Sequence, residues 1–163
     1  MKTLLLMRHA KSSWKDSELD DHDRGLNGRG KKDAPRMGEL LKEQNLLPDY
    51  VVTSSARRAR KTADHVALAS GYRGECRLTG ELYMAGPDKF LEVIRQTPDS
   101  CERLLLIGHN PGLEEFFEQL TGTYTPLPTA AVARLELDLD SWQNLTPESN
   151  AELIRLWQPR ELA

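Results

Sequence analysis

The stretch "TLLLMRHAKSSW", residues 3–14, runs from an apolar segment directly into an arginine and a histidine. A continuous apolar run is typical of a strand that is covered on both faces, as in a parallel sheet. We therefore predict a buried strand over Thr3–Met7, which places Arg8 and His9 at its carboxyl end.

Strand and helix patterns alternate along the rest of the chain. Apolar runs or apolar alternation predict further strands at 50–53, 77–79, 103–108, 133–139 and 153–157. Helical spacing of apolar residues predicts helices that end near 44, 69, 95 and 120, and their caps include Asn27, Ser54 or Ser55, and Asn110. This order predicts an α/β fold, a three-layer α/β/α sandwich with a mostly parallel central sheet and an antiparallel C-terminal edge.

The composition, with 39% apolar and 29% charged residues over 163 positions, is that of a globular protein with a single domain, 1–163. The net charge of -3 argues against a nucleic-acid partner. A nucleic-acid-binding function that rests on the short basic run at 57–61 is therefore the weakest of the alternative functions. The two cysteines lack metal-site spacing, and no segment has the length of a signal peptide or a membrane span. We therefore expect a soluble cytoplasmic protein without membrane contact.

Unusual residues follow three of the predicted strands. They are Arg8-His9 after the first strand, "SSARRARKT" at 54–62, and "GHNPG" at 108–112. In open α/β sheets, ligands bind beyond the carboxyl ends of the strands. If these strands are parallel neighbours, His9, Arg58 and His109 converge on one rim.

The charges at the start of the second predicted helix have an unexpected sign. Its first turns contain Arg57, Arg58, Arg60 and Lys61 with no acid before Asp64, although a helix N-terminus favours negative charge. A solvated basic face explains most of these cations. An oxyanion such as phosphate, bound by one arginine and by free backbone N–H groups, would remove the mismatch.

Two of the four histidines are candidates for catalysis. We interpret His65, inside a helix, and His22, in the polar "DDHDR" loop at 20–24, as structural, and that loop lacks a recognisable metal-ligand spacing. His9 and His109 instead lie at the ends of apolar strands. Neutral imidazole accepts a phosphoryl group and guanidinium binds its oxygens. The residues therefore predict phosphoryl transfer through phosphohistidine, without a metal or another cofactor.

Four segments resemble motifs of the histidine phosphatase superfamily. "LMRHAKSSW" at 6–14 resembles the RHG signature, "SSARRARKTA" at 54–63 resembles the motif S-x-x-x-R-A-x-x-T, and "LIGHNPGL" at 106–113 resembles the second histidine motif. "DRGLNGRGKKDA" at 23–34 is similar to the segment R-P-L-x-x-x-G-x-x-x-A of the SixA-like phosphohistidine phosphatase branch. The resemblance implies a phosphoglycerate mutase-like fold.

The resemblance also implies roles for single residues. His9 would be the phosphorylated nucleophile and Arg8 its phosphate ligand. Arg58 would be a second phosphate ligand, and His109 would stabilise the transferred phosphoryl group. Arg24, from the R-P-L segment, would reach the substrate side of the pocket.

The resemblance also implies a general acid. Many members supply one after the third strand, where Glu81 in "GELY" is the candidate, and a solvated loop carboxylate is the alternative interpretation. A substrate whose leaving group is imidazole depends less on such an acid.

The sequence departs from the family pattern at several positions, and its compactness favours the SixA-like branch. Ala10 replaces the glycine of RHG, Gly25 replaces the proline of R-P-L, and Lys11 and Lys15 stand where the mutase branch tends to have Glu and Asn. The chain also lacks the long insertions that form a lid in larger members. The predicted substrate is therefore phosphohistidine on a signalling or phosphotransfer protein.

Two alternative functions remain. The first is a phosphomonoesterase or mutase that acts on a small phosphorylated metabolite, and the second is a non-catalytic phosphoprotein-binding module. The oligomeric state is not predicted.

Overall fold

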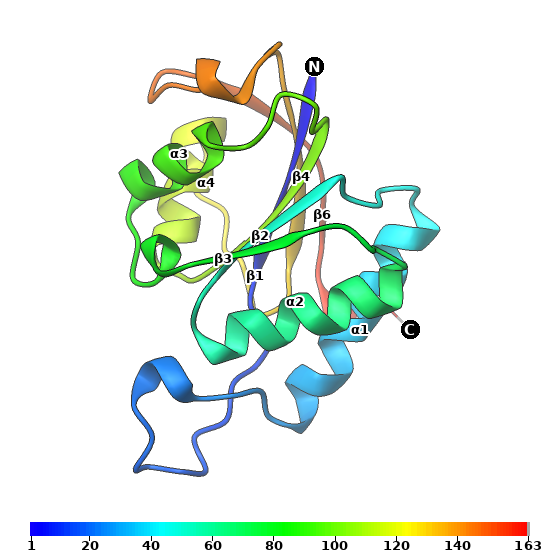
Figure 1. Ribbon diagram of the computed structural model, residues 1–163, viewed down its shortest axis with the longest axis vertical. Coiled ribbons are helices and arrows are strands. Elements are labelled where there is room, and N and C mark those ends of the chain that lie inside the picture. The colour runs from blue at the N-terminus through cyan, green and yellow to red at the C-terminus, as the bar shows by residue number, and fades with distance from the viewer. Residues whose placement is uncertain (163) are drawn as a thin grey trace.

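Six strands form one sheet at the centre of the molecule, in the computed structural model that describes residues 1–162 (Figure 1). The strands are β1 Lys2–Arg8, β2 Tyr50–Ser54, β3 Cys76–Thr79, β4 Arg103–Gly108, β5 Val132–Leu137 and β6 Ala151–Trp157. Their order is β3-β2-β4-β1-β5-β6. The first four strands are parallel, and β5 is antiparallel to both β1 and β6. The predicted mostly parallel sheet with an antiparallel C-terminal edge is confirmed.

Four α-helices cover the sheet in two layers (Figure 1). They are α1 Gly28–Glu43, α2 Arg57–Ser70, α3 Pro87–Arg95 and α4 Gly112–Thr121, and 3-10 turns span Asp21–Asp23, Gly80–Leu82, Trp142–Asn144 and Pro159–Glu161. Helices α1 and α2 pack on one face, and α3 and α4 pack on the other. The three-layer α/β/α sandwich is confirmed.

Strand β1 contributes to both hydrophobic cores because successive side chains of a strand point to opposite faces. Leu4 and Leu6 pack in the core beneath α3 and α4, and Leu5 and Met7 pack in the core beneath α1 and α2. All four side chains are fully buried. This explains the continuous apolar run in the sequence, and it fixes the direction in which the chain leaves the sheet at Arg8.

The start of α1 agrees with the sequence, but the start of α2 does not. Asn27 caps α1, because its Oδ1 accepts a hydrogen bond of 2.8 Å from the backbone N–H of Gly30. The predicted cap of α2 at Ser54 or Ser55 is wrong, since Ala56 is the N-cap residue and no side chain caps the helix. The two serine hydroxyls instead face histidine side chains of the site described below.

The predicted cap of α4 is also wrong. Asn110 lies one residue too early, and Pro111 is the N-cap residue of a helix that begins at Gly112. The Asn110 side chain donates its Nδ2 hydrogen to the carbonyl of Leu127, at 2.9 Å. It therefore ties the β4–α4 junction to the loop before β5 rather than capping the helix.

The loop between β1 and α1 is held against both helices of its layer. The backbone N–H of Ala10 donates to Thr62 Oγ1 of α2 at 2.9 Å, and the N–H of Asn27 donates to the carbonyl of Lys11 at 3.0 Å. The carbonyl of Lys11 lies against Gly30 so closely that a Cβ on Gly30 would overlap it. This packing positions the chain immediately after His9. Within residues 1–162, no helix has the length and the apolar content that a membrane crossing requires.

A methyl group at Gly30 should displace this loop. We expect Gly30→Ala to lower the free energy of unfolding by about 1 to 3 kcal/mol, the usual effect of overpacking. Urea denaturation measures the change. Gly28→Ala is the matched control, because a Cβ at Gly28 meets nothing within 4 Å. Equal stability of the two variants would contradict the proposed contact.

Candidate active site

The parallel strands bring the two histidine motifs together. Arg8 at the end of β1 lies opposite Gly108 at the end of β4, so that His9 and His109 are the next residues of neighbouring strands. Their ring centroids are 5.0 Å apart, and each residue is only 7% exposed. Strand β2 pairs with the other side of β4 and leads into α2, which brings Arg58 to the same edge.

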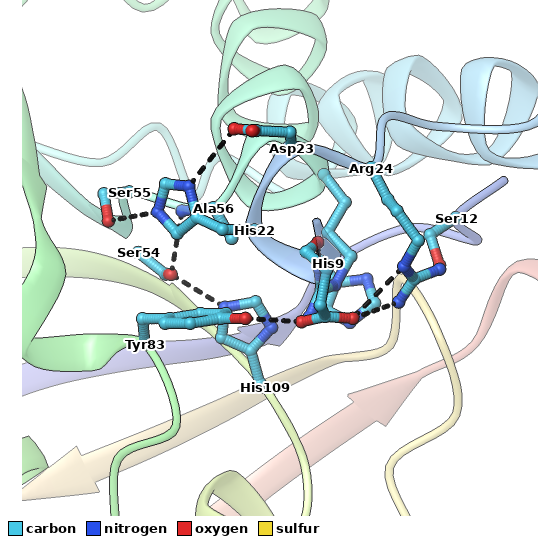
Figure 2. A network of polar contacts seen from close by, with 12 residues as sticks. His9, Ser12, His22, Asp23, Arg24, Ser54, Ser55, Ala56, Tyr83 and His109 are labelled. Carbon is cyan, nitrogen blue, oxygen red and sulfur yellow. Dashed lines mark hydrogen bonds and ion pairs between the residues drawn. The ribbon is translucent and has the colours of Figure 1, made fainter. Parts of the chain in front are cut away.

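One cavity of about 300 Å³ collects most of the residues singled out in the sequence. Its lining includes Arg8, His9, Arg24, Arg58 and His109. Figure 2 shows the side chains of His9, His109 and Arg24 gathered around the same space. Three guanidinium groups and two imidazoles therefore face one small volume.

Glu81 is the sixth predicted residue, and the structure places it apart from the other five. It lies in the 3-10 turn Gly80–Leu82, is exposed to solvent, and is not among the residues that line the cavity. The same segment does contribute a neighbouring side chain, because Tyr83 lines an adjoining cavity together with Arg58 and His109.

A single hydrogen bond sets the tautomer of the neutral His9 ring. Its Nδ1 lies 2.7 Å from the backbone carbonyl of Ala10. Because a carbonyl oxygen only accepts, the proton of the neutral ring is on Nδ1 and the lone pair is on Nε2. Burial, together with the nearby positive charges of Arg58 and Arg8, lowers the pKa of His9 to about 3. The ring is therefore a neutral nucleophile at pH 7.

His109 is held by the end of β2. Its Nε2 lies 2.7 Å from Ser54 Oγ, and burial lowers its pKa to about 4, with a further lowering from Arg58. Within residues 1–162, His109 Nδ1, Arg8 Nε and Arg58 Nε are buried without a hydrogen-bond partner. Buried donors without partners are costly, and a tetrahedral oxyanion offers the acceptors that guanidinium groups need.

The carboxylate of Asp21 lies between two of the arginines. Its Oδ1 accepts from Arg24 Nη2 at 2.8 Å and Nε at 3.1 Å, and its Oδ2 accepts from Arg58 Nη2 at 3.1 Å and from the Tyr83 hydroxyl at 2.6 Å. The Asp21 carbonyl accepts a further bond from Arg58 Nη1 at 2.8 Å. The hydrogen bond from Tyr83, with those from the arginines, lowers the pKa of Asp21 well below its usual range. The ionised carboxylate therefore accepts hydrogen bonds from guanidinium N–H groups of Arg24 and Arg58 that could otherwise bind a phosphoryl group.

His22 lies at the margin of this cluster rather than in an isolated polar loop. Its Nε2 is 2.9 Å from Ser55 Oγ, and its ring stands edge-on to Tyr83 at 4.9 Å between centroids (Figure 2). Tyr83 in turn stands edge-on to His109 at 5.7 Å. Within residues 1–162, no group of three or more His, Cys, Asp or Glu side chains is arranged to hold a metal ion.

Sequence reasoning did not select Asp21, His22 or Tyr83 as site residues. The signal in the sequence is the acidic cluster directly before Arg24, which lacks metal-ligand spacing. An acid placed near an arginine is also a candidate ion-pair partner. Tyr83 follows Glu81 in the same "GELY" segment and lines the adjoining cavity, whereas the role of Glu81 as a general acid stays a prediction.

Comparisons with known proteins agree with this geometry. A family model of the histidine phosphatase superfamily (branch 1) matches residues 4–82. Protein ML1117 of Mycobacterium leprae (strain TN), whose name states no activity, is 34% identical over 167 residues, covering 94% of this chain and 100% of that protein. The chain belongs to the histidine phosphatase superfamily.

Two solved SixA structures resemble this histidine phosphatase over nearly its whole length. The candidate phosphohistidine phosphatase SixA from Nakamurella multipartitia has a TM-score of 0.85 and 27% identity, covering 97% of this chain and 96% of that chain. The candidate phosphohistidine phosphatase SixA from Agrobacterium tumefaciens has a TM-score of 0.83 and 26% identity, covering 97% and 98%. The SixA likeness therefore includes the antiparallel edge as well as the motif-bearing strands.

Removal of the Asp21 charge should make the cavity of this histidine phosphatase a better anion site. We expect Asp21→Asn to bind inorganic phosphate about 3- to 10-fold more tightly, because it removes a competing anion whose charged hydrogen bonds with the arginines are each worth about 1.5 to 3 kcal/mol before solvent screening. Isothermal titration calorimetry measures the affinity. Asp20→Asn is the matched control, since the same charge is lost one residue away. Weaker phosphate binding by Asp21→Asn would show that the carboxylate mainly positions the arginines.

The two buried imidazoles should make stability depend on pH. Their pKa values of about 3 and 4 lie below the ordinary value of 6.5. As the pH falls from 7 to 5, the unfolded chain binds protons that the folded chain does not, so the free energy of unfolding falls. Each imidazole contributes at most about 1.4 kcal/mol per pH unit. His9→Asn should remove about half of this combined contribution, as measured by urea denaturation at several pH values. Equal slopes for the wild type and the variant would contradict it.

Proposed function

We propose that this histidine phosphatase removes the phosphoryl group from phosphohistidine on a protein, through a phosphorylated His9. The observation that carries the proposal is the bond from His9 Nδ1 to the Ala10 carbonyl, which leaves a neutral Nε2 in a cavity lined by three arginines. The SixA proteins that the chain resembles are named as candidate phosphohistidine phosphatases. The proposed cycle uses no metal ion or cofactor.

The first step transfers the phosphoryl group to the enzyme. Nε2 of His9 attacks the phosphorus in line with the P–N bond to the substrate histidine. The substrate ring is protonated on its other nitrogen, so that when the P–N bond breaks its electron pair returns to a neutral imidazole, and a new P–N bond forms on His9. Arg8 and Arg58 bind the phosphoryl oxygens, and His109 lies beside them. Charge stabilisation by such preorganised donors is the main contribution that a protein makes to phosphoryl transfer.

The second step releases inorganic phosphate. Water attacks the phosphorus of phospho-His9, and the P–N bond breaks with its electron pair returning to Nε2. Both protons of the water leave with the phosphate. The Nδ1 hydrogen bond to Ala10 holds the ring in the same orientation through both steps.

The acid-base groups around the cavity favour a phosphohistidine over an alkyl phosphate. An alkoxide leaving group needs a proton donor, whereas an imidazole leaves readily. Glu81 is exposed and outside the cavity lining, and Asp21 is ionised. Neither carboxyl group is therefore arranged to donate a proton at neutral pH. The free thiols of Cys76 and Cys101 accord with the cytoplasm as the proposed compartment.

Substitution of the nucleophile tests this function. We expect His9→Ala to reduce turnover of a chemically phosphorylated histidine peptide by at least about 1000-fold, because the covalent route is lost. The wild type should form an acid-labile phosphoenzyme, measured by incorporation of labelled phosphate. The variant keeps His22, His65 and His109, so it also tests which histidine is labelled.

Three outcomes would contradict the proposal in different ways. Labelling of His9→Ala would place the phosphoryl group on another residue. Binding of the phosphopeptide by the wild type without turnover would indicate a phosphoprotein-binding module. A higher kcat/KM for sugar phosphates than for the phosphopeptide would indicate a phosphomonoesterase or mutase that uses the same arginines and histidines.

A further inference from the structure

A second cavity, of about 490 Å³, lies beside the catalytic cavity. We call it the basic cleft and define it by Lys15, Lys31, Arg57 and Lys61, which come from the β1–α1 loop, α1 and α2. Arg24 lines both the basic cleft and the catalytic cavity. The two cavities are therefore neighbours that share one guanidinium group.

Most cations of the basic cleft have no acidic partner. Within residues 1–162, Lys15, Lys31 and Arg57 form no ion pair, and Lys61 reaches Asp64 only at 3.9 Å across an exposed surface. The cleft lining contains four Lys and Arg side chains in addition to Arg24, but a single carboxylate, Asp16. Such a concentration of positive charge stands out in a protein whose net charge is -3.

The two helices that border the cleft increase its positive potential. The first turns of α1 and α2 contain no acid, whereas those of α3 and α4 do. Each helix N-terminus has roughly half a positive charge, so cations such as Lys31 and Arg57 are unfavourable there in the absence of an anion. Helices α3 and α4 also begin near the site but have acids in their first turns, so the unfavourable charge is confined to the two helices that border the cleft. An anionic ligand explains this distribution.

Exposed apolar side chains beside the two cavities indicate that this ligand belongs to a protein. Trp14 lines the catalytic cavity, is 72% exposed, and stacks on Arg24, whose guanidinium carbon is 3.5 Å from the ring centroid. Met84 is 83% exposed and lines the adjoining cavity with Tyr83 and His109. Aromatic residues, Met and Arg are enriched where proteins bind one another. A small metabolite would leave these apolar surfaces in water.

We propose that the basic cleft binds aspartate or glutamate side chains of the phosphoprotein substrate, next to its phosphorylated histidine. This inference rests on the proposed function, because it assigns the surroundings of the phosphohistidine that His9 would attack. Opposite charges raise the rate of encounter and fix the orientation of the two partners. The cleft therefore selects the protein, and the catalytic cavity selects the phosphoryl group.

Two matched peptides test the charge preference. Both contain one phosphohistidine, flanked by glutamates in the first peptide and by glutamines in the second. We expect the wild type to cleave the glutamate peptide with about tenfold higher kcat/KM at low salt. The preference should disappear near 1 M salt, where the screening length falls to about 3 Å. Release of inorganic phosphate measures both rates.

Charge reversal in the cleft tests its location. We expect Lys31→Glu/Arg57→Glu to abolish the preference for the glutamate peptide while hydrolysis of p-nitrophenyl phosphate stays within about twofold of the wild type. Both side chains are exposed, and exposed substitutions seldom change stability by more than about 0.5 kcal/mol. Lys42→Glu/Lys89→Glu is the control, because it changes the net charge equally at exposed positions outside the cleft lining. The control should keep the preference.

The outcomes separate this inference from the proposed function. Equal cleavage of both peptides by the wild type would overturn the docking site and leave the phosphohistidine phosphatase intact. Loss of the preference in the control variant would also overturn it, since net charge alone would then be responsible. Hydrolysis of p-nitrophenyl phosphate with cleavage of neither peptide would overturn both. A preference for bisphosphorylated over monophosphorylated sugars that the cleft variant loses would assign the cleft to a small molecule instead.

Discussion

The register of β1 against β4 determines the geometry of the whole site. Arg8 lies opposite Gly108, so the residues that follow each strand, His9 and His109, are held within a few ångströms of one another. A slip of one residue would turn every side chain of β1 to the other face and would exchange its two apolar sets between the cores. The full burial of Leu4, Leu5, Leu6 and Met7 prevents this slip. The hydrophobic effect thus positions the nucleophile, although it acts on other residues.

The polar part of the site depends on a balance between buried charges. The guanidinium groups of Arg24 and Arg58 are almost entirely buried, and an isolated buried cation is strongly unfavourable. Asp21 offsets this cost through contacts with both groups. The half-exposed position of its carboxylate keeps the interaction weaker than that of a fully buried pair. In the free protein, Asp21 therefore stabilises the two buried guanidinium groups, and a bound anion can still compete with its carboxylate for their N–H groups.

Local pattern was sufficient for the fold and for Arg8, His9, Arg58 and His109, whereas Arg24 was indicated by the family resemblance. Buried strands give continuous apolar runs, and the parallel order then brings the ends of β1, β2 and β4 to one edge. Asp21 and Tyr83 could not be found in this way, because their hydrogen bond joins loops 62 residues apart in the sequence. The caps of α2 and α4 were mistaken for a related reason. Ser54, Ser55 and Asn110 are good capping residues, but tertiary partners use their side chains.

The two serines at the start of α2 have a thermodynamic consequence. Because their hydroxyl groups face His109 and His22, α2 begins without a side-chain cap. The positive end of the helix dipole also repels the arginine side chains of the first turn. A missing cap costs about 1 kcal/mol, so this turn is less stable than a capped turn with the same tertiary contacts would be. An anion bound at this edge stabilises the turn that binds it. Occupancy of the site and the stability of the first turn of α2 are therefore linked equilibria.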